Sequence, residues 1–591
     1  MTMNFQVNLQ GLIDLLSNHL YSDPGIFIRE LLQNGVDAVT ARKRLGQSFE
    51  GQVLVEVYPS ETLSFTDNGS GLTAEEIEQF LARIGSTTKR GDLDLADDYI
   101  GQFGVGLLSC FVVSDEIVLI TRSAKGDGAL EWRGKPDGTY GIRSLEREVP
   151  VGTTVFLKAK PEFAEFFQYD QVEELLHKFG QYLSTPIILK EDRYERRINV
   201  SKAPWDMKKE EALAYVEETS YYRPMDIIPL VSAVGGVRGI AHVLPHAVSL
   251  QDEKRHRVYL KNMLLSDKLS SILPPWAFFV NGILNTDSLR PTASREAFQE
   301  NELFFAAREE LGECIKRYLM ELVDREPELF QRLVRVHTES IKAMAVEDQD
   351  LYELFIRHLS FETSFGDLRV SDILASRKEI LLAPTVDEFR QIARVAKSEE
   401  MLVVNGGYVH DLDLARRLPW VDSSATVRIV NTLEFAERFK ELGAEEKAEV
   451  QPFLELSDRL LSGFQCQSLV RWFEPADLPV LYNTNQEVNF FRLADDAEEK
   501  ADPLYAEVVR VIRDALYERP YARVCYNYNN PLVRKAVESG NPRMQKACIE
   551  LFYTQALLLG NHPMNADELK LMNDSLLFFM NEGLARTEVD R

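Results

Sequence analysis

Cysteine is scarce in this chain, and the cysteines that are present follow no pattern. There are five among 591 residues, widely separated and never arranged as Cys-x-x-Cys. That spacing predicts neither a zinc site nor a disulfide framework, and it is typical of proteins in a reducing compartment. His242 and His246 are four residues apart, but Pro245 between them argues against a metal pair on one helix.

Basic residues and long apolar runs are also in short supply. The 67 lysines and arginines stand against 93 acidic residues, which gives a net charge of −26. This balance disfavours a surface built mainly to hold nucleic acid. No apolar run approaches transmembrane length, and no basic segment followed by an apolar stretch opens the sequence. We therefore expect a cytoplasmic protein with no nucleic-acid and no membrane partner.

Two familiar nucleotide-binding motifs are missing from the sequence. There is no GxxxxGK[ST] motif, and the glycines at 101–106 do not directly follow a strand, as a Rossmann fingerprint requires. These glycines instead precede a short apolar segment at 108–113, which we expect to be helical. Backbone N–H groups before a helix can close around an anion, so a nucleotide bound here would need a different cradle.

The segment 27–41 is the most informative part of the sequence. Read as a helix, it places Glu30, Asn34 and Asp37 at i, i+4 and i+7 on one side and its apolar residues on the other. The ordinary interpretation is a solvent-exposed face, but such faces usually mix charges of both signs. An acid–amide–acid stripe without lysine or arginine instead suits a hydrated cation and a water molecule.

A second cluster follows a predicted strand at 62–66. Asp67 is delivered by the strand, and Gly69 and Gly71 allow the backbone to turn tightly against a flat or charged group. The alternative is a plain hairpin turn, yet a helical stretch at 74–84 follows instead of a pairing strand. The next loop, 85–91, is rich in hydroxyl groups and is either a phosphate-contacting lid or merely flexible.

Strand and helix patterns along the chain predict the α+β class, because antiparallel strands and helices are segregated. We expect strands at 52–58, 62–66, 117–122, 130–132, 140–144, 154–159, 227–231, 239–244, 257–260, 380–382, 402–405 and 427–430. We expect helices at 163–184, 304–342, 542–559 and 566–584, the last with Asn565 as its N-cap. The apolar stripe of the last helix suits either a domain core or a subunit interface.

Four motifs in order resemble the GHKL ATPase superfamily. They are ExxxNxxDA at 30–38, DxGxG at 67–71, GQFGVG at 101–106 and the pair Gly152-Thr153. The wording of segments 20–38 and 100–109 is similar to the ninety-kilodalton heat-shock chaperones in particular. The resemblance implies an α+β multidomain chain with an N-terminal GHKL (Bergerat-type) α/β sandwich ATPase domain, an α/β middle domain and a mixed α/β C-terminal dimerisation domain.

The resemblance also implies ATP and magnesium as cofactors and a role for each matching residue. Glu30 would polarise the attacking water, Asn34 would hold magnesium, Asp37 would support that site and Asp67 would accept the adenine amino group. The further nucleotide-binding candidates are Arg29, Gly71, Lys89, Gly104, Val105, Gly106, Leu107 and Thr153. Three positions depart from the family pattern, Gln79, Gly85 and Leu107, and they bear on nucleotide affinity and lid behaviour.

The segment 289–301 is similar to the catalytic loop of the same chaperones. An arginine near a helix start is usually a surface cation, but here the resemblance implies that Arg295 reaches the γ-phosphate and that Gln299 assists. The implied domains are 1–195 for ATP binding with a lid at about 72–100, 196–449 for the middle domain and 450–591 for dimerisation.

The function implied by the resemblance is an ATP-dependent chaperone of the stress response. It would act as a homodimeric clamp on unfolded or partly folded client proteins, with slow hydrolysis coupled to closure. One alternative is a DNA-acting relative such as MutL or a topoisomerase subunit, which the net charge of −26 argues against. Another is an ATP-independent holdase with a degenerate pocket.

Overall fold

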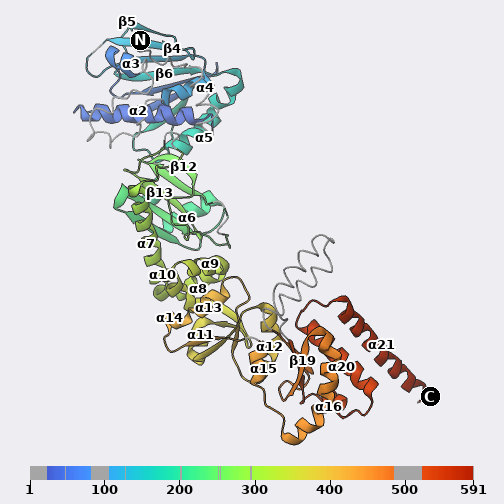
Figure 1. The fold of residues 1–591 in the computed structure, drawn as a ribbon. Helices are drawn as coiled ribbons and strands as arrows, with labels where there is room; N and C mark the ends of the chain where they lie inside the picture. Colours follow the sequence, from blue (N-terminus) through green and yellow to red (C-terminus); the bar gives the residue numbers. More distant parts are fainter. Residues whose placement is uncertain are drawn as a thin grey trace, which may run out of the picture. The chain divides into compact units, whose positions relative to one another are not determined.

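The fold was analysed in a computed structural model of the chain. It describes residues 23–46, 48–80, 106–126, 128–199, 202–249, 252, 254–292, 296–430, 432–484 and 522–589. These residues form two compact units, Met1–His337 and Thr338–Arg591. Figure 1 shows both units as mixtures of helices and sheets, which confirms the α+β multidomain class.

The first unit begins with an eight-stranded sheet in the order β5-β4-β3-β6-β2-β1-β7-β8. Its strands are β1 (Val53–Tyr58), β2 (Thr62–Asp67), β3 (Ile117–Arg122), β4 (Ala129–Gly134), β5 (Tyr140–Leu145), β6 (Gly152–Lys158), β7 (Ile187–Glu191) and β8 (Tyr194–Arg197). Neighbouring strands are antiparallel except for the parallel pair β1 and β7. The six strands predicted in this region are confirmed. The hairpin of β7 and β8 was not predicted, and its last residue, Arg197, lies beyond the boundary expected at 195.

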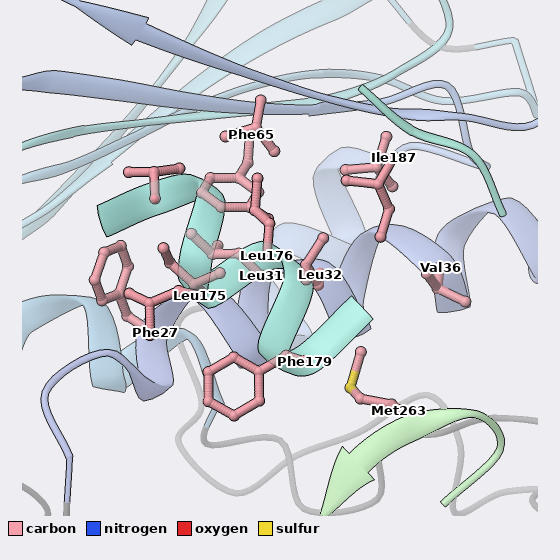
Figure 2. Packing of buried hydrophobic residues seen from close by; sticks show 14 of the residues in the cluster. Phe27, Leu31, Leu32, Val36, Phe65, Leu175, Leu176, Phe179, Ile187 and Met263 are labelled. Carbon is pink, nitrogen blue, oxygen red and sulfur yellow. The ribbon is translucent and has the colours of Figure 1, made fainter. Parts of the chain in front are cut away.

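Helix α2 (Ile26–Arg44) packs its apolar side between this sheet and helix α5 (Tyr169–Gly180). Phe27 stacks on Phe167 with ring centroids 5.6 Å apart, and Figure 2 shows Leu31 and Leu32 beside Leu176. A Cβ on Gly35 would lie only 3.0 Å from a methyl of Val53. The glycine therefore lets the helix approach β1 closely, which offsets its cost of about 1 kcal/mol against alanine in a helix.

A second, five-stranded sheet in the same unit has the order β12-β11-β13-β10-β9. Its strands are β9 (Ile227–Ser232), β10 (Val237–Val243), β11 (His256–Leu260), β12 (Met263–Leu269) and β13 (Val280–Thr286), and its helices are α6 (Lys209–Ser220), α7 (Glu302–Arg325) and α8 (Pro327–Val336). Met263 of β12 belongs to the same hydrophobic cluster as Phe179 of α5 (Figure 2). The two sheets of this unit therefore share one continuous apolar core.

The second unit also contains two sheets. The first has the order β15-β14-β17-β16-β18 and the second β19-β21-β20. The strands are β14 (Ser360–Thr363), β15 (Gly366–Arg369), β16 (Glu379–Ala383), β17 (Val403–Asn405), β18 (Thr426–Ile429), β19 (Cys466–Arg471), β20 (Val480–Asn483) and β21 (Ala522–Asn527). The main helices are α9 (Thr338–Glu347), α12 (Val386–Ser398), α16 (Ala444–Leu461), α19 (Pro531–Glu538), α20 (Pro542–Leu559) and α21 (Ala566–Val589). The strands predicted at 380–382, 402–405 and 427–430 and the two last helices are confirmed, whereas the division at 196–449 and 450–591 stays a prediction.

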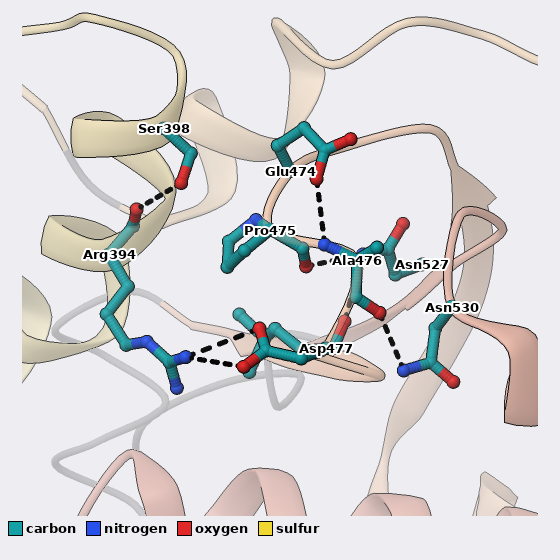
Figure 3. A network of polar contacts seen from close by, with 9 residues as sticks. Arg394, Ser398, Glu474, Pro475, Ala476, Asp477, Asn527 and Asn530 are labelled. Atoms are coloured by element: carbon teal, nitrogen blue, oxygen red, sulfur yellow. Dashed lines mark hydrogen bonds and ion pairs between the residues drawn. The ribbon is translucent and has the colours of Figure 1, made fainter.

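The Asn-Pro segment after β21 fixes the loop between β19 and β20. Asn527 donates to the carbonyls of Pro475 and Leu478 at 3.2 and 2.9 Å, and Asn530 donates to that of Ala476 at 2.9 Å. Figure 3 shows how Asp477 in this loop meets Arg394 of α12, with the nearer oxygen at 3.0 Å. The loop therefore ties the last sheet to α12.

Helix α21 opens with the predicted capping arrangement. Asn565 Oδ1 accepts from the Glu568 N–H at 2.9 Å, and Glu568 Oε2 accepts from the Asn565 N–H at 3.0 Å. The apolar stripe of the helix is largely exposed, because Leu569, Leu576 and Met580 are 47%, 45% and 61% accessible. Within the described ranges, no helix is long and apolar enough to cross a bilayer.

Candidate functional site

The candidate site lies where α2 meets the ends of β2 and β6 and the short helix η4 (Gly106–Ser109). Glu30, on the first turns of α2, is only 2% exposed. Its Oε1 accepts a hydrogen bond from the Arg29 guanidinium at 3.3 Å, and Arg29 is itself 3% exposed. The carboxylate is therefore held in a buried place with a cation beside it.

Gly106 stands directly against Glu30. A Cβ on this glycine would come within 2.3 Å of Glu30 Oε2, so a side chain there would displace the carboxylate. Ser109 closes the turn behind it by donating to the Gly106 carbonyl at 2.7 Å. The backbone that the sequence predicts as an anion cradle thus ends beside the predicted water-polarising acid.

Asp67 ends β2 and faces Thr153 across the antiparallel pairing of β2 with β6. Its Oδ1 accepts from the Gly69 N–H at 2.8 Å. Burial raises the pKa of Asp67 to about 7, although the Gly69 and Thr153 N–H groups act in the opposite direction. Protein-buried carboxyl groups with perturbed pKa values cluster at functional sites, and this one is an acceptor placed at a strand end.

Two glycines next to Asp67 cannot carry a side chain. Gly71 has φ +60°, and a Cβ there would lie 2.0 Å from the Arg122 carbonyl oxygen. Gly152 has φ +136°, and its Cβ would lie 2.1 Å from the Asp67 carbonyl oxygen. The backbone segments around Asp67 therefore approach one another as closely as glycine permits.

Thr121 of β3 completes this region and was missed by sequence reasoning. It is fully buried, and its hydroxyl accepts from the Leu72 N–H at 2.9 Å. The same hydroxyl lies 3.1 Å from the Gly152 carbonyl and 3.0 Å from the Thr153 hydroxyl. Threonine is a common strand residue, so the sequence gives no signal that sets Thr121 apart.

The residues of the stripe predicted on α2 differ in how deeply they are buried. Asp37 is 4% exposed, whereas Asn34 faces solvent. Across the described residues, no group of three or more His, Cys, Asp and Glu side chains could hold a metal ion. Asn34 and Asp37 could supply one or two oxygen ligands, which is the number of protein ligands that a magnesium ion uses alongside waters and phosphate oxygens.

Some of the predicted site residues lie outside the described residues. They are Lys89, Gly104, Val105 and Arg295, together with the lid beyond residue 80. Leu107 is described and packs, partly buried, against the core of the first sheet. Gln79 is exposed on α3 (Ala74–Phe80).

The loop before α7 is described on both sides of Arg295. The Gln299 N–H donates to the Arg290 carbonyl at 2.8 Å, and its side-chain Nε2 donates to Pro291 O at 3.1 Å. Gln299 is thus fixed at the base of its own loop, and the described contacts do not bring it to Glu30. Asn301 then caps α7 by accepting from the Phe304 N–H at 3.0 Å.

Comparison with known proteins gives two family matches. The model for "Histidine kinase-, DNA gyrase B-, and HSP90-like ATPase" matches residues 23–135, and the model for "Hsp90 protein" matches residues 244–373. Each match covers less than half of the chain, so these two segments are similar to those families. The first match contains Glu30, Asp67 and Gly106, and the second contains the loop with Gln299. The region around the candidate site is therefore similar to GHKL-type ATPase domains.

Two curated proteins that are similar to this chain share one name. A protein of Chlorobium luteolum named "Chaperone protein HtpG" is 27% identical over 61% of this chain and 62% of its own length. Its namesake from Oceanobacillus iheyensis is 27% identical over 68% of this chain and 72% of its own length. The chain thus spans a little under two thirds of the length of the Chlorobium protein.

Proposed function

We propose that this protein is an ATP-dependent chaperone that acts as a homodimeric clamp on unfolded or partly folded client proteins. The observation that carries the proposal is the pairing of two buried carboxylates with glycine-lined backbone. Gly152 lies against the backbone of Asp67, and Gly106 lies against the carboxylate of Glu30. The names of the similar proteins, "Chaperone protein HtpG", supply the chaperone part.

Adenine recognition is assigned to Asp67 and its neighbours. An aspartate at a strand end can accept from the amino group of the base, and the Thr121–Thr153 hydroxyl pair at 3.0 Å can pass a hydrogen bond through water to a ring nitrogen. At Gly71 the backbone packs directly against the Arg122 carbonyl, where a side chain would not fit. A purine with an exocyclic amine needs a flat backbone surface and one buried hydrogen-bond acceptor.

Hydrolysis is assigned to Glu30, positioned rather than freely mobile because Arg29 holds one of its oxygens at 3.3 Å. Its other oxygen faces the Gly106 backbone, and from there it would orient a water for in-line attack. Asn34, exposed one turn later, would hold magnesium with support from Asp37, and that ion would neutralise phosphate charge when bound. Positioning and charge neutralisation supply most of the rate in phosphoryl transfer.

The remaining parts of the proposal concern the whole protein. Arg295 would supply a guanidinium to the γ-phosphate from the loop that Gln299 anchors, and Gly104, Val105 and Lys89 would contact the phosphates. Closure rather than chemistry would limit turnover. The apolar stripe of α21 would form the contact between two copies, and the protein would work in the cytoplasm, without nucleic-acid or membrane partners.

Replacing the water-polarising acid tests the central assignment. Glu30→Ala should bind ATP within about threefold of the parent and hydrolyse it at least about 100-fold more slowly, which is the lower end of general-base contributions. Affinity is measured by calorimetry and turnover by phosphate release. Glu162→Ala, at an exposed position of η5 (Pro161–Phe167), is the matched control. Parent-like hydrolysis by Glu30→Ala would refute the assignment, and absence of nucleotide binding by the parent would favour an ATP-independent holdase.

A further inference from the structure

A cavity lies at the junction of the two sheets in the first unit. Its volume is about 420 Å³, within the range of small-molecule sites. Its wall is formed by the segment after α5, strand β8, the segment after β8, strand β10 and the turn between β11 and β12. None of the residues assigned to nucleotide binding lines it, so it is separate from the site at Glu30 and Asp67.

The floor of this junction cavity is rigid. Asn199 is buried there, accepts from the Ile187 N–H at 2.8 Å and donates to the carbonyls of Leu183 and Thr185 at 2.6 and 2.7 Å. Tyr182 packs edge-on against Trp205 and Tyr259, in both cases with centroids 5.2 Å apart. With its amide fully used, the floor is a preformed surface that a ligand need not reorganise.

The rim of the cavity is cationic. Arg197, Lys202 and Arg238 line it, against one acid, Asp206. Asp206 meets Arg238 only at 3.6 Å, with both side chains about half exposed, and exposed pairs of this kind contribute little. Lys202 pairs with Glu211 at 2.6 Å, outside the lining. Among the residues that the structure describes, the Arg197 guanidinium makes no hydrogen bond or ion pair.

We propose that the junction cavity binds a small polyanion carrying two or more phosphate groups. Arginine presents paired N–H donors that match phosphate oxygens, and Arg197 and Arg238 offer two such forks on opposite elements. The surplus of positive charge is local, because the chain as a whole carries −26. Repulsion from distant acids is screened beyond about 8–10 Å at physiological salt, so the field inside the cavity is set by the charges near its rim, three cations against Asp206 and Glu211.

Neutral donors add specificity to the charge. The Ser184 hydroxyl and the Asn262 side-chain amide line the same cavity, and neither has a partner in the described part of the chain. Both can donate to phosphate oxygens without adding charge. A volume of about 420 Å³ suits a few phosphate groups and not an extended acidic peptide, which would use only the exposed rim.

Binding here would link the two sheets. Arg197 ends β8 of the first sheet, and Arg238 lies in β10 of the second. A polyanion held by both would resist separation of the sheets, and the aromatic contacts of Tyr182 and Trp205 beneath it would report that restraint. The proposal does not depend on ATP binding, because the cavity shares no residue with the nucleotide site.

The test uses the full chain and inorganic tripolyphosphate as the probe, titrated by calorimetry. Arg197→Ala and Arg238→Ala should each weaken binding about tenfold or more, as expected for the loss of a hydrogen bond to a charged group. Arg193→Ala is the matched control, since Arg193 is exposed in the turn of the same β7–β8 hairpin but does not line the cavity. Thermal unfolding of each variant checks that all three remain folded.

The possible results separate cleanly. Selective loss in both cavity variants, with Arg193→Ala like the parent, supports the site even if some tripolyphosphate also binds near Gly106. Equal loss in all three variants, no loss in the two cavity variants, or no binding by the parent at millimolar probe overturns it. A hexaglutamate peptide that binds the parent more tightly than tripolyphosphate would overturn the assignment to a small phosphorylated ligand.

Discussion

The protonation of Asp67 couples the candidate site to stability. Its folded-state pKa is about 7, well above the ordinary 3.8, so the folded protein holds a proton that the unfolded chain releases between those values. Stability from this group is therefore present at low pH and falls as pH rises through about 7. At neutral pH and above, the ligand-free protein is destabilised by the buried negative charge of Asp67, the group that would accept a hydrogen bond from the ligand.

Replacing Asp67 with asparagine should separate binding from stability. Asp67→Asn should abolish measurable nucleotide binding, because its amide can place a donor against the adenine amino group. The ligand-free variant should unfold with a free energy higher by on the order of 1–3 kcal/mol at pH 8, with a smaller gain at pH 5. Urea denaturation at both pH values and calorimetry with ATP measure the two effects. A variant that is less stable at pH 8 and still binds ATP would contradict both expectations.

Among the elements, α21 has the surface that is hardest to explain in a single chain. Leu569, Leu576 and Met580 are spaced by seven and four residues, so they lie on one face, and each is substantially exposed. Leu577 and Leu584, at 49% and 64% accessible, extend the apolar surface. Contiguous exposed apolar surface of this kind marks an interaction site more often than a solvated face.

Charged residues on this face should dissociate the proposed dimer. Leu576→Asp combined with Met580→Asp should raise the dimer dissociation constant by about 100-fold or more, since interface hot spots are worth about 2 kcal/mol or more each. Sedimentation velocity over a range of concentrations gives the constant. Met320→Asp is the control, because Met320 on α7 is also 63% exposed and apolar. An unchanged sedimentation coefficient in the double variant would place the interface elsewhere.

What the sequence predicts at this scale depends on periodicity. Strands β1 to β6 of the first sheet and the helices α20 and α21 are predicted because alternation and apolar stripes are local properties. The stripe on α2 gives the correct face but not its depth, since Glu30 is buried and Asn34 exposed only through packing against η4 and α5. Thr121 and the cavity rim are not predictable, because Arg197 and Arg238 are brought together by the meeting of two sheets.

At the scale of the whole molecule, the first unit contains buried histidines that make the folded state less stable at low pH. Burial lowers the pKa of His242 to about 4, and Arg257 acts in the same direction. Burial lowers that of His256 to about 3, assisted by Lys254 and His242. Because the unfolded values are near 6.5, the unfolded chain binds more protons below that pH, and stability is lost as pH falls from about 6.5 toward 4.

The first unit should therefore lose about 2 kcal/mol per buried histidine between pH 7 and pH 5. Asp67 acts in the opposite direction, so the measurement is a difference between variants. His242→Gln should show a smaller loss of urea stability over this range than the parent. His246→Gln is the control, as His246 is exposed four residues away. Identical pH dependence in the parent and His242→Gln would contradict the assignment.

The buried free cysteines of this protein can serve as probes of local opening. Cys110, packed behind Glu30, and Cys525, in β21, are fully buried, and burial raises the pKa of each thiol. A thiol of this kind reacts with a labelling reagent only while its surroundings are open. Cys110 lies in the first compact unit and Cys525 in the second. The labelling rates of the two thiols in the unaltered chain therefore measure separately how often the wall of the candidate site opens and how often the last sheet opens. A nucleotide that holds the first unit closed should lower the labelling rate of Cys110 and leave that of Cys525 unchanged.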